Sequence, residues 1–501
     1  ISSETAWRVA PLPLWTGSGY GAEYYINLNH SFTHWAKEYG DEHPEWFATI
    51  DGISDAKRKK DSNRAIIDFT EPGVLKTTVR EARDYFENPP GAARAGLSAA
   101  QQKRFFPIYG VVPNDSFVEV GKDAEEQGWV TPERGRAGRF SDYVWHFVNE
   151  VARELYPAVP ERFVGSLAYA RQFLPPLRLE KLAPNVVVMA CRQRLDCWDP
   201  AEKEKDRTAL ARWAELTEPK IYVWEYYNRR RHPYFRNVPM IAPHLIAEDI
   251  RFLKDLSRGE FVEAESPQGP GRKDWDRRWN NRGLSHLNLY VTARCLWNPD
   301  LDVDALLLDY YATFYGPAAP PMRAFYSLLE ECWMDTDRHR FGDQRPWQTL
   351  YPKETRERLF ALLERAKATA GKSVYGRRVA YITGEFSAMR AEAAKALKWA
   401  APPELRVPHV DAPPTVDGVL TEPVWTRASS AELVLNATGE APAQAPSFRA
   451  LYNDTTLYLA VRIPRTPATE LTAAVTTRDG QMWTDDSIEL FLDPKNTYET
   501  Y

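Results

Sequence analysis

Short apolar runs alternate with longer amphipathic segments through the first half of the chain. The spacing of apolar residues in 141–156 and 201–216 is typical of helices with one buried face. Because strands that alternate with helices form parallel sheets, the pattern predicts an α/β fold. The number of strand-like runs predicts a (β/α)8 barrel of the TIM type, with a further strand within residues 8–15 or upstream of residue 1. The runs are residues 24–29, 64–69, 106–112, 163–169, 186–190, 221–225 and 260–263.

The pattern changes twice after the last predicted strand. From residue 284 onward only helical periodicity remains, and we assign residues 1–335 to the barrel and residues 336–400 to a helical extension. Residues 401–413 are rich in proline and predict a linker. Beyond them the alternation has the period of two that is typical of antiparallel strands, so residues 414–501 predict the start of an all-β sandwich. We expect the chain to be a fragment of a longer protein.

The composition argues against several classes of function. The 501 residues carry a formal net charge of −5, so no basic surface for nucleic acid is expected. No run approaches the ~18 apolar residues that span a membrane. The four cysteines lack C-x-x-C spacing and predict neither a disulfide framework nor a zinc site. Aromatic residues make up 13% of the chain, and such rings offer flat surfaces on which sugars stack.

Polar side chains follow several of the predicted strands directly. In parallel barrels the chemistry lies at the carboxyl ends of the strands, so these side chains are the first candidates for a site. They include Asn114 and Asp115 after the run 106–112, Tyr169 and Arg171 after the run 163–169, Trp224 and Glu225 at the end of the run 221–225, and Glu263 at the end of the run 260–263.

Asp115, Glu225 and Glu263 are therefore predicted to face one rim. Glycoside hydrolysis requires a proton donor and a second carboxylate that acts as base, nucleophile or orienting group, and different strands of a barrel can supply the two. The alternative is that Glu225 pairs with Arg229 or Arg230 at the surface and that Glu263 is merely solvated. Charged residues at strand ends are common, so the pattern leaves both interpretations open.

Two further features are candidates for ligand contact. His30 and His34 have i, i+4 spacing, but no third ligand follows, and we predict rim or core histidines in preference to a metal site. The loop at residues 268–279 carries Trp275 and is long enough to cover a bound glycan. The alternative is a solvated loop anchored by one buried tryptophan.

Several strings in the first two thirds of the chain resemble a known family. HPEWFA at residues 43–48 and WNPDLDVDAL at residues 297–306 are the most specific of them. They resemble the bacterial barrel proteins grouped as domain of unknown function 4838, which are associated with glycoside hydrolase family 163, endo-β-N-acetylglucosaminidases acting on N-glycans. The resemblance covers roughly residues 20–335. It implies that the matching rim residues are His30, Asn114, Asp115, Glu225 and Glu263.

The resemblance also implies a mechanism for glycans that carry a 2-acetamido group. One carboxylate orients the acetamide as an internal nucleophile, and another protonates the leaving oxygen. On this interpretation Glu225 or Glu263 is the general acid and Asp115 is the orienting or stabilising partner. The sequence fixes neither the distance between the carboxylates nor the stereochemical outcome.

The C-terminal segment resembles a second family. VDGVLTEPVW at residues 416–425 and WTDDSIELFLD at residues 483–493 are similar to carbohydrate-binding module family 9, a β-sandwich. The resemblance implies that Trp483 stacks on a terminal sugar, with core packing as the alternative, whereas Trp425 is predicted to lie in the core. Many modules of this kind contain a structural calcium ion, so Ca²⁺ is an option here.

Together these features predict a secreted, periplasmic or cell-surface bacterial glycoside hydrolase that acts on an oligosaccharide or a glycoprotein glycan. No organic cofactor is expected. One alternative is an α-glucuronidase-like enzyme that binds a uronate carboxylate through Arg171 or the arginines at 229–231. The other is a glycan-binding protein without catalytic activity.

Overall fold

The computed structural model describes residues 15–16, 19–20, 28, 30–50, 52–59, 64–88, 107–115, 117, 119–218, 221–227, 238–264, 282–339, 346–398, 405–433, 442, 444–464, 471–476, 482, 485–488 and 490. The chain divides into two compact units, Ile1–Arg390 and Ala391–Tyr501.

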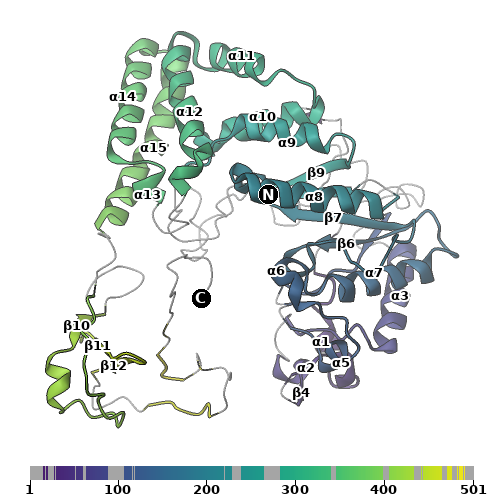
Figure 1. Cartoon of the computed structure of the whole chain (residues 1–501). Coiled ribbons are helices and arrows are strands. Elements are labelled where there is room, and N and C mark those ends of the chain that lie inside the picture. Colours follow the sequence, from purple (N-terminus) through teal and green to yellow (C-terminus); the bar gives the residue numbers. More distant parts are fainter. Residues whose placement is uncertain are drawn as a thin grey trace. The chain divides into compact units, whose positions relative to one another are not determined.

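The centre of the first unit is a five-stranded parallel sheet (Figure 1). Adjacent strands in the sheet are also consecutive in the chain, as expected for strands joined by crossover connections. Five of the predicted runs are therefore confirmed as strands, and the fold class is α/β with a parallel sheet. The strands are β5 (Ile108–Gly110), β6 (Phe163–Ala168), β7 (Val186–Arg192), β8 (Ile221–Tyr227) and β9 (Ser257–Ala264).

One predicted strand is wrong. Residues 64–69 contribute only an isolated antiparallel bridge, between Ile67 and Phe47. The backbone N–H of Ile66 donates to the buried carboxylate of Asp55 at 2.8 Å. A backbone donor that is bonded to a side chain is not available to a neighbouring strand. Of the predicted run 24–29, only Leu28 belongs to the described residues.

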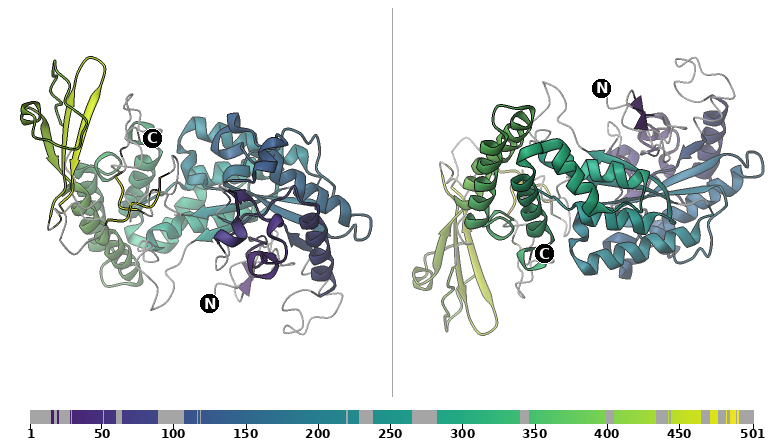
Figure 2. Two further views of the ribbon diagram at one scale, coloured as in Figure 1. Left: turned by 90° about the horizontal axis from the view of Figure 1, so that it is seen from below. Right: turned by 90° about the horizontal axis from the view of Figure 1, so that it is seen from above.

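Helices α7 (Ser141–Leu155) and α8 (Pro200–Leu216) confirm the two predicted helical segments and cover one side of the sheet (Figure 2). Trp145 of α7 and Trp213 of α8 are fully buried, and their ring centroids lie 4.5 Å apart. Helix α8 begins where Asp199 accepts a hydrogen bond from the backbone N–H of Ala201 at 2.8 Å. We call the side of the sheet that packs on these helices the helix face. Its strand residues include Val186, Val188, Ile221 and Val223.

The opposite side of the sheet is lined mainly by large side chains. Because side chains alternate along a strand, the residues between those of the helix face point to this second side. Trp224, Tyr226 and Phe261 pack there together with Met189 and Leu167. Trp224 and Phe261 meet edge to face with ring centroids 4.7 Å apart, a favourable arrangement for aromatic pairs. We call this side the aromatic face.

Shorter elements surround the sheet in the N-terminal part of the first unit. Helix α3 begins at a proline, which suits the first turn because its missing N–H would have no helical partner. The strands are β1 (Trp15–Thr16) with β2 (Gly19–Tyr20), and β3 (Thr49–Ile50) with β4 (Ile53–Ser54). The helices are α1 (Trp35–Tyr39), α2 (Asp55–Arg58), α3 (Pro72–Glu87), α5 (Lys122–Glu126) and α6 (Gly135–Gly138).

After α8, the described part of the first unit consists of helices together with β8 and β9. From residue 284 onward it contains helices and no strand, as the helical periodicity predicts. Phe386 joins three of its long helices, because its ring lies 5.2 Å from that of Phe325 and 4.9 Å from that of Phe360. No helix in the described part of the chain has the length and apolar character to cross a bilayer. The helices are α9 (Pro243–Leu253), α10 (Arg282–Trp297), α11 (Val303–Tyr315), α12 (Ala319–Met334), α13 (Pro346–Thr349), α14 (Lys353–Ala370) and α15 (Val374–Lys398), the last of which runs into the second unit.

The second unit contains an antiparallel sheet of β10 (Ser429–Glu432), β11 (Ser447–Tyr452) and β12 (Leu457–Arg462). Trp425 is 5% exposed and packs with Val410 and Leu451 in its small core, so the prediction that this tryptophan is a core residue is confirmed. The prediction of antiparallel strands in this segment is also confirmed, for β11 and β12.

Candidate functional site

Three of the predicted site residues meet at the carboxyl ends of β5 and β6. The hydroxyl of Tyr169 donates a hydrogen bond to Asp115 Oδ1 at 3.2 Å, and Nε2 of His30 lies 3.7 Å from the same oxygen. The side chain of Asp115 is 53% exposed, so it is open to a ligand. We call His30, Asp115 and Tyr169 the rim cluster.

The backbone around β5 explains why His30 lies there. The hydroxyl of Ser31 donates to the carbonyl of Gly110 at 2.8 Å and accepts from the N–H of Val112 at 3.0 Å. The N–H of Ser31 also donates to the carbonyl of Val112 at 2.9 Å. Nδ1 of His30 lies 2.6 Å from the carbonyl oxygen of Pro113, which orients the other ring nitrogen toward Asp115. A segment 80 residues earlier in the chain is thus fixed to the strand end.

Tyr169 connects the rim cluster to the aromatic face. Its ring packs against the apolar cluster that contains Trp224 and Tyr226, while its hydroxyl reaches Asp115. Trp224 is 5% exposed and belongs to this apolar cluster, so its indole ring is packed inside the protein. Only a small part of the Trp224 ring is therefore accessible for the predicted contact with a ligand.

Asn114 points away from the rim cluster. Its side chain is buried, and its amide N–H₂ donates to the backbone carbonyl of Ala65 at 2.7 Å. This bond fixes the chain that follows β5 to the segment around Ala65. The structure therefore gives Asn114 a role in holding the loop of Asp115, and not a direct position in the cluster.

Glu225 lies on the helix face and is fully buried, away from the aromatic face. One carboxylate oxygen accepts a hydrogen bond from the backbone N–H of Arg194 at 2.6 Å. The other lies 3.6 Å from Nε of Arg194 and 3.9 Å from Nε of Arg192. A substrate has no access to this carboxylate, so the geometry does not support the prediction that Glu225 is a rim acid. Arg229 and Arg230 lie outside the described residues.

The two arginines hold further carboxylates around Glu225. Asp249 of α9 lies 2.9 Å from both Nη1 of Arg192 and Nε of Arg194, and Glu260 of β9 lies 2.6 Å from Nη2 of Arg194. We call Arg192, Arg194, Glu225, Asp249 and Glu260 the buried ion network. It joins three strands to a helix, and the sequence reasoning missed it. The signal in the sequence was the pair Arg192 and Arg194, two cations that closely follow the apolar run 186–190. Charges beside a buried strand require partners of opposite charge, because an unpaired charge away from water is costly.

Burial and the arginines act in opposite directions on the carboxyl groups of this network. Burial raises the pKa of Glu225 to about 8, although Arg194 and Arg192 oppose the shift. For Asp249 burial also acts to raise the pKa, but the two guanidinium groups outweigh it and the pKa lies below its usual value. Glu225 therefore holds a proton around neutral pH. The arginines pair with the other carboxylates: Asp249 contacts both, Glu260 contacts Arg194 and Asp206 contacts Arg192.

The other predicted site residues are placed only in part. Glu263 pairs in register with Tyr226 in the β8–β9 ladder, near the carboxyl end of β9. Arg171 lies in a short 3-10 helix after β6, and burial together with nearby Arg136 and Arg139 lowers its pKa. Trp275 and Trp483 lie outside the described residues.

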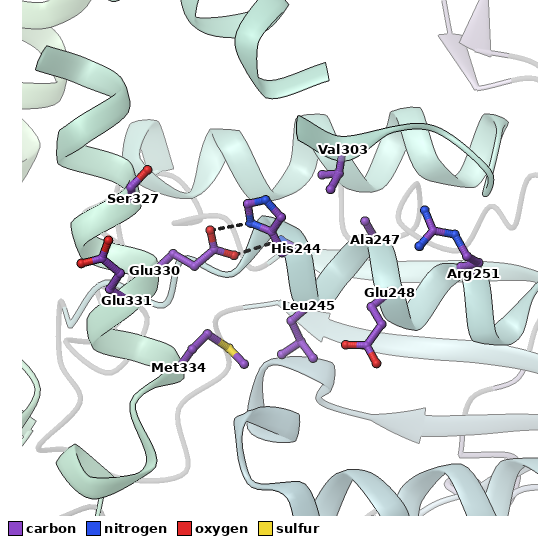
Figure 3. A pocket seen from close by; sticks show the side chains of 10 residues that line it. All are labelled: His244, Leu245, Ala247, Glu248, Arg251, Val303, Ser327, Glu330, Glu331 and Met334. Carbon is purple, nitrogen blue, oxygen red and sulfur yellow. Dashed lines mark hydrogen bonds and ion pairs between the residues drawn. The ribbon is translucent and has the colours of Figure 1, made fainter. Parts of the chain in front are cut away.

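A cavity of about 580 Å³ lies between helices, away from the strands. Figure 3 shows the Glu330 carboxylate reaching to His244, with Nδ1 of His244 and Oε2 of Glu330 2.7 Å apart. The hydrogen bond that Nδ1 of His244 donates to Glu330 raises the pKa of His244 to about 9. The residues that line the cavity come only from α9, α11 and α12: His244, Leu245, Ala247, Glu248, Arg251, Val303, Ser327, Glu330, Glu331 and Met334. The pair joins α9 to α12, and we assign it to stability.

No group of three or more His, Cys, Asp or Glu side chains within the described residues is arranged to hold a metal ion. All four cysteines are buried thiols.

Two family models match the chain. The model described as Domain of unknown function (DUF4838) matches residues 4–327, and the model described as Carbohydrate family 9 binding domain-like matches residues 416–501. These matches confirm the two resemblances seen in the sequence, and the second one indicates that the chain binds glycans. No curated protein and no solved structure matches the chain.

Proposed function

Since the chain belongs to the family described as Domain of unknown function (DUF4838), we propose that it is a glycoside hydrolase acting on complex glycans, with its site at the rim cluster. The observation that carries the proposal is the meeting of Asp115, His30 and Tyr169 at the carboxyl ends of two parallel strands. Parallel α/β sheets bind their ligands at this edge. A carbohydrate-binding domain in the same chain supports a glycan as the ligand.

In this proposal the five strands belong to a (β/α)8 barrel, whose interior is the aromatic face. Asp115 is the orienting carboxylate, and Tyr169 and His30 hold it in place by the contacts described above. Glu263 is the proton donor, because strand alternation assigns position 263 of β9 to the same side as Phe261. Glu225 has a structural role in the buried ion network.

The reaction we propose is endo-β-N-acetylglucosaminidase-like hydrolysis with assistance from the substrate. The acetamido oxygen attacks the anomeric carbon, and the bond to the leaving oxygen breaks as Glu263 donates a proton to that oxygen. Asp115 stabilises the acetamido N–H while positive charge develops there. Water then opens the cyclic intermediate and returns a proton to Glu263. We place this activity in a secreted, periplasmic or cell-surface bacterial protein.

A second candidate is an α-glucuronidase-like enzyme. The observation that favours it is that Arg171 lies near Arg136 and Arg139. Arg171 is also only two residues after Tyr169 of the rim cluster. Arginine forms paired hydrogen bonds to carboxylates, so this group suits the uronate of an acidic glycan. A glycan-binding protein without catalysis is the third possibility, and it would need no proton donor.

The test is release of sugar from a complex N-glycoprotein and from aryl glycosides, including an aryl α-glucuronide, followed by mass spectrometry. We expect the wild-type protein to release intact glycan, and Glu263→Gln and Asp115→Asn to lose this release. Glu225→Gln is the matched control, because the same change is made in a carboxylate that substrate does not reach. Loss of release in Glu225→Gln, with Glu263→Gln active, would reverse the assignment. Cleavage of the glucuronide alone would favour the second candidate, and glycan binding without cleavage the third.

The carbohydrate-binding domain is tested separately. Trp483→Ala is expected to weaken retention on immobilised glycan without lowering turnover of a small aryl glycoside. Trp425 is not a suitable variant for this purpose, because it lies in the core of the second unit.

A further inference from the structure

A second cavity, of about 400 Å³, lies in the helical part of the first unit. Its volume falls within the range of pockets that take small ligands. It is formed by α15, the start of α10 and the end of α11, so none of the strands that carry the proposed active site contributes to it. The residues that line it are Gly283, His286, Phe314, Val374, Arg377, Arg378, Tyr381 and Ile382.

Two arginines from adjacent positions of α15 face this cavity. Arg378 donates to the backbone carbonyl of Phe314 at 2.8 Å, and its guanidinium lies 4.4 Å from the centre of the Phe314 ring. Arg377 is exposed. Within the described residues neither arginine forms an ion pair with a carboxylate. Both side chains line the cavity, so an anion there meets two positive charges, of which the exposed Arg377 guanidinium is the more accessible.

Apolar and aromatic side chains form the rest of the wall. Tyr381 is 58% exposed and Val374 is 41% exposed, which is a large apolar surface to leave in water. Phe314 closes the far side, and its ring stacks on that of His286 with centroids 5.4 Å apart. An exposed tyrosine ring offers a flat face to the C–H groups of a sugar.

The other titratable groups near the cavity do not cancel the positive charge. Partial burial lowers the pKa of His286, so its ring is neutral at neutral pH. Glu385 accepts hydrogen bonds from the backbone N–H groups of Gly283 and Leu284 at the start of α10, and its single negative charge offsets only one of the two arginines. The cavity therefore has a net positive charge that suits an anionic ligand.

We propose that this cavity binds an acidic sugar, whose carboxylate is held by Arg377 and Arg378 and whose ring lies on Tyr381. The anionic part of the ligand follows from the arginines, and the sugar part rests on the proposed function. The site would let the protein hold a charged branch of a glycan while another branch occupies the rim cluster. Its occupant differs from the ligand of the rim cluster because the rim cluster presents a carboxylate and this cavity presents cations.

The experiment is isothermal titration of the full chain with methyl glucuronide, methyl glucoside and acetate. We expect methyl glucuronide to bind and the other two to bind at least about tenfold more weakly, since each lacks one of the two recognised features. Arg377→Gln should weaken glucuronide binding about tenfold or more, and Arg377→Glu should abolish it. Arg365→Gln, on the exposed side of α14, is the matched control and should bind as the wild-type protein does.

The outcomes separate this site from the proposed active site. Asp115→Asn should keep the Arg377-dependent binding, so a protein without hydrolase activity can still support the inference. Glucuronide binding that is unchanged in both Arg377 variants would overturn it, as would an absence of binding. Equal binding of acetate and glucuronide would show an anion site without sugar recognition and would also overturn it.

Discussion

The backbone N–H of Arg194 donates a hydrogen bond to the Glu225 carboxylate at 2.6 Å, in a part of the protein that water does not reach. This contact explains why a buried strand ends on a carboxyl group. From the sequence alone Glu225 is a candidate both for ion pairing and for catalysis. In the structure Glu225 stabilises the fold, and the carboxylates at the rim remain the candidates for catalysis.

We predict that Glu225→Gln leaves stability nearly unchanged at pH 6 and that Glu225→Ala lowers it. Glutamine keeps the acceptor for the Arg194 N–H, whereas alanine leaves that N–H unpaired beside a cavity and should cost about 2–4 kcal/mol. Denaturant unfolding at pH 6 measures both. Equal destabilisation by the two variants would contradict the structural role of this hydrogen bond.

The pH dependence of Glu225→Gln is a separate prediction. The pKa of Glu225 is raised from 4.5 to about 8. Between these two pH values the carboxyl group is therefore protonated in the folded protein and ionised in the unfolded chain. The contribution of this group to stability is fully present below pH 4.5 and is lost as the pH rises through about 8. Glutamine cannot ionise, so the variant should gain stability relative to wild type as the pH rises from 5 to 9. Melting temperatures across this range check it, and a constant difference would refute it.

The His244–Glu330 pair predicts a loss of stability at high pH. The pKa of His244 is raised from 6.5 to about 9, so the stabilisation is fully present below pH 6.5 and disappears as the pH rises through about 9. Because the histidine is 47% exposed, solvent screening limits the effect to about 1 kcal/mol. Glu330→Gln should remove most of this pH dependence and leave the smaller part that comes from Asp304, 3.4 Å from Nε2 of His244. Glu331→Gln, the exposed neighbour on the same helix, should leave it in place.

Tyr169→Phe is predicted to lower turnover without unfolding the protein. The variant keeps the ring on the aromatic face and removes one hydrogen bond to Asp115, so a loss of roughly tenfold is expected. Asp115→Asn should cost more, about 10² or above, because it removes the charge itself. Asp123→Asn, at an exposed position on α5, serves as the control. Turnover of an aryl glycoside measures all three, and an unchanged Asp115→Asn protein would place the chemistry elsewhere.

Glycine to alanine at two positions should have effects of opposite sign. A Cβ at Gly165 of β6 would lie 2.4 Å from a methyl carbon of Leu28 and 2.8 Å from one of Ile108, so this variant should lose about 1–3 kcal/mol. A Cβ at Gly384 of α15 would meet no atom within 4 Å, and alanine favours a helix by up to about 1 kcal/mol. Thermal unfolding compares the two. A stable Gly165→Ala protein would show that Leu28 is free to move aside.

The strands β5 to β9 could be predicted because each is a short apolar run and helical segments lie between most of the runs. The run 64–69 has the same composition but is not a strand, because the carboxylate of Asp55, eleven residues away, takes one of its backbone donors. Proximity of Asp115 and Tyr169 was expected from strand ends meeting at one edge, and the place of His30 at the rim was implied by the family resemblance. The face on which Glu225 lies could not be predicted, since alternation assigns a face only when one neighbour is known to be inside.

The buried ion network also has a consequence for the order in which the protein assembles. Its members come from β7, the turn after it, β8, α9 and β9, so no shorter segment contains all the charges. A nascent chain that ends before Glu260 leaves the Arg194 guanidinium without one of its counter-ions, and enclosing that charge would be unfavourable. The network can therefore be completed only after residue 260 has emerged from the ribosome.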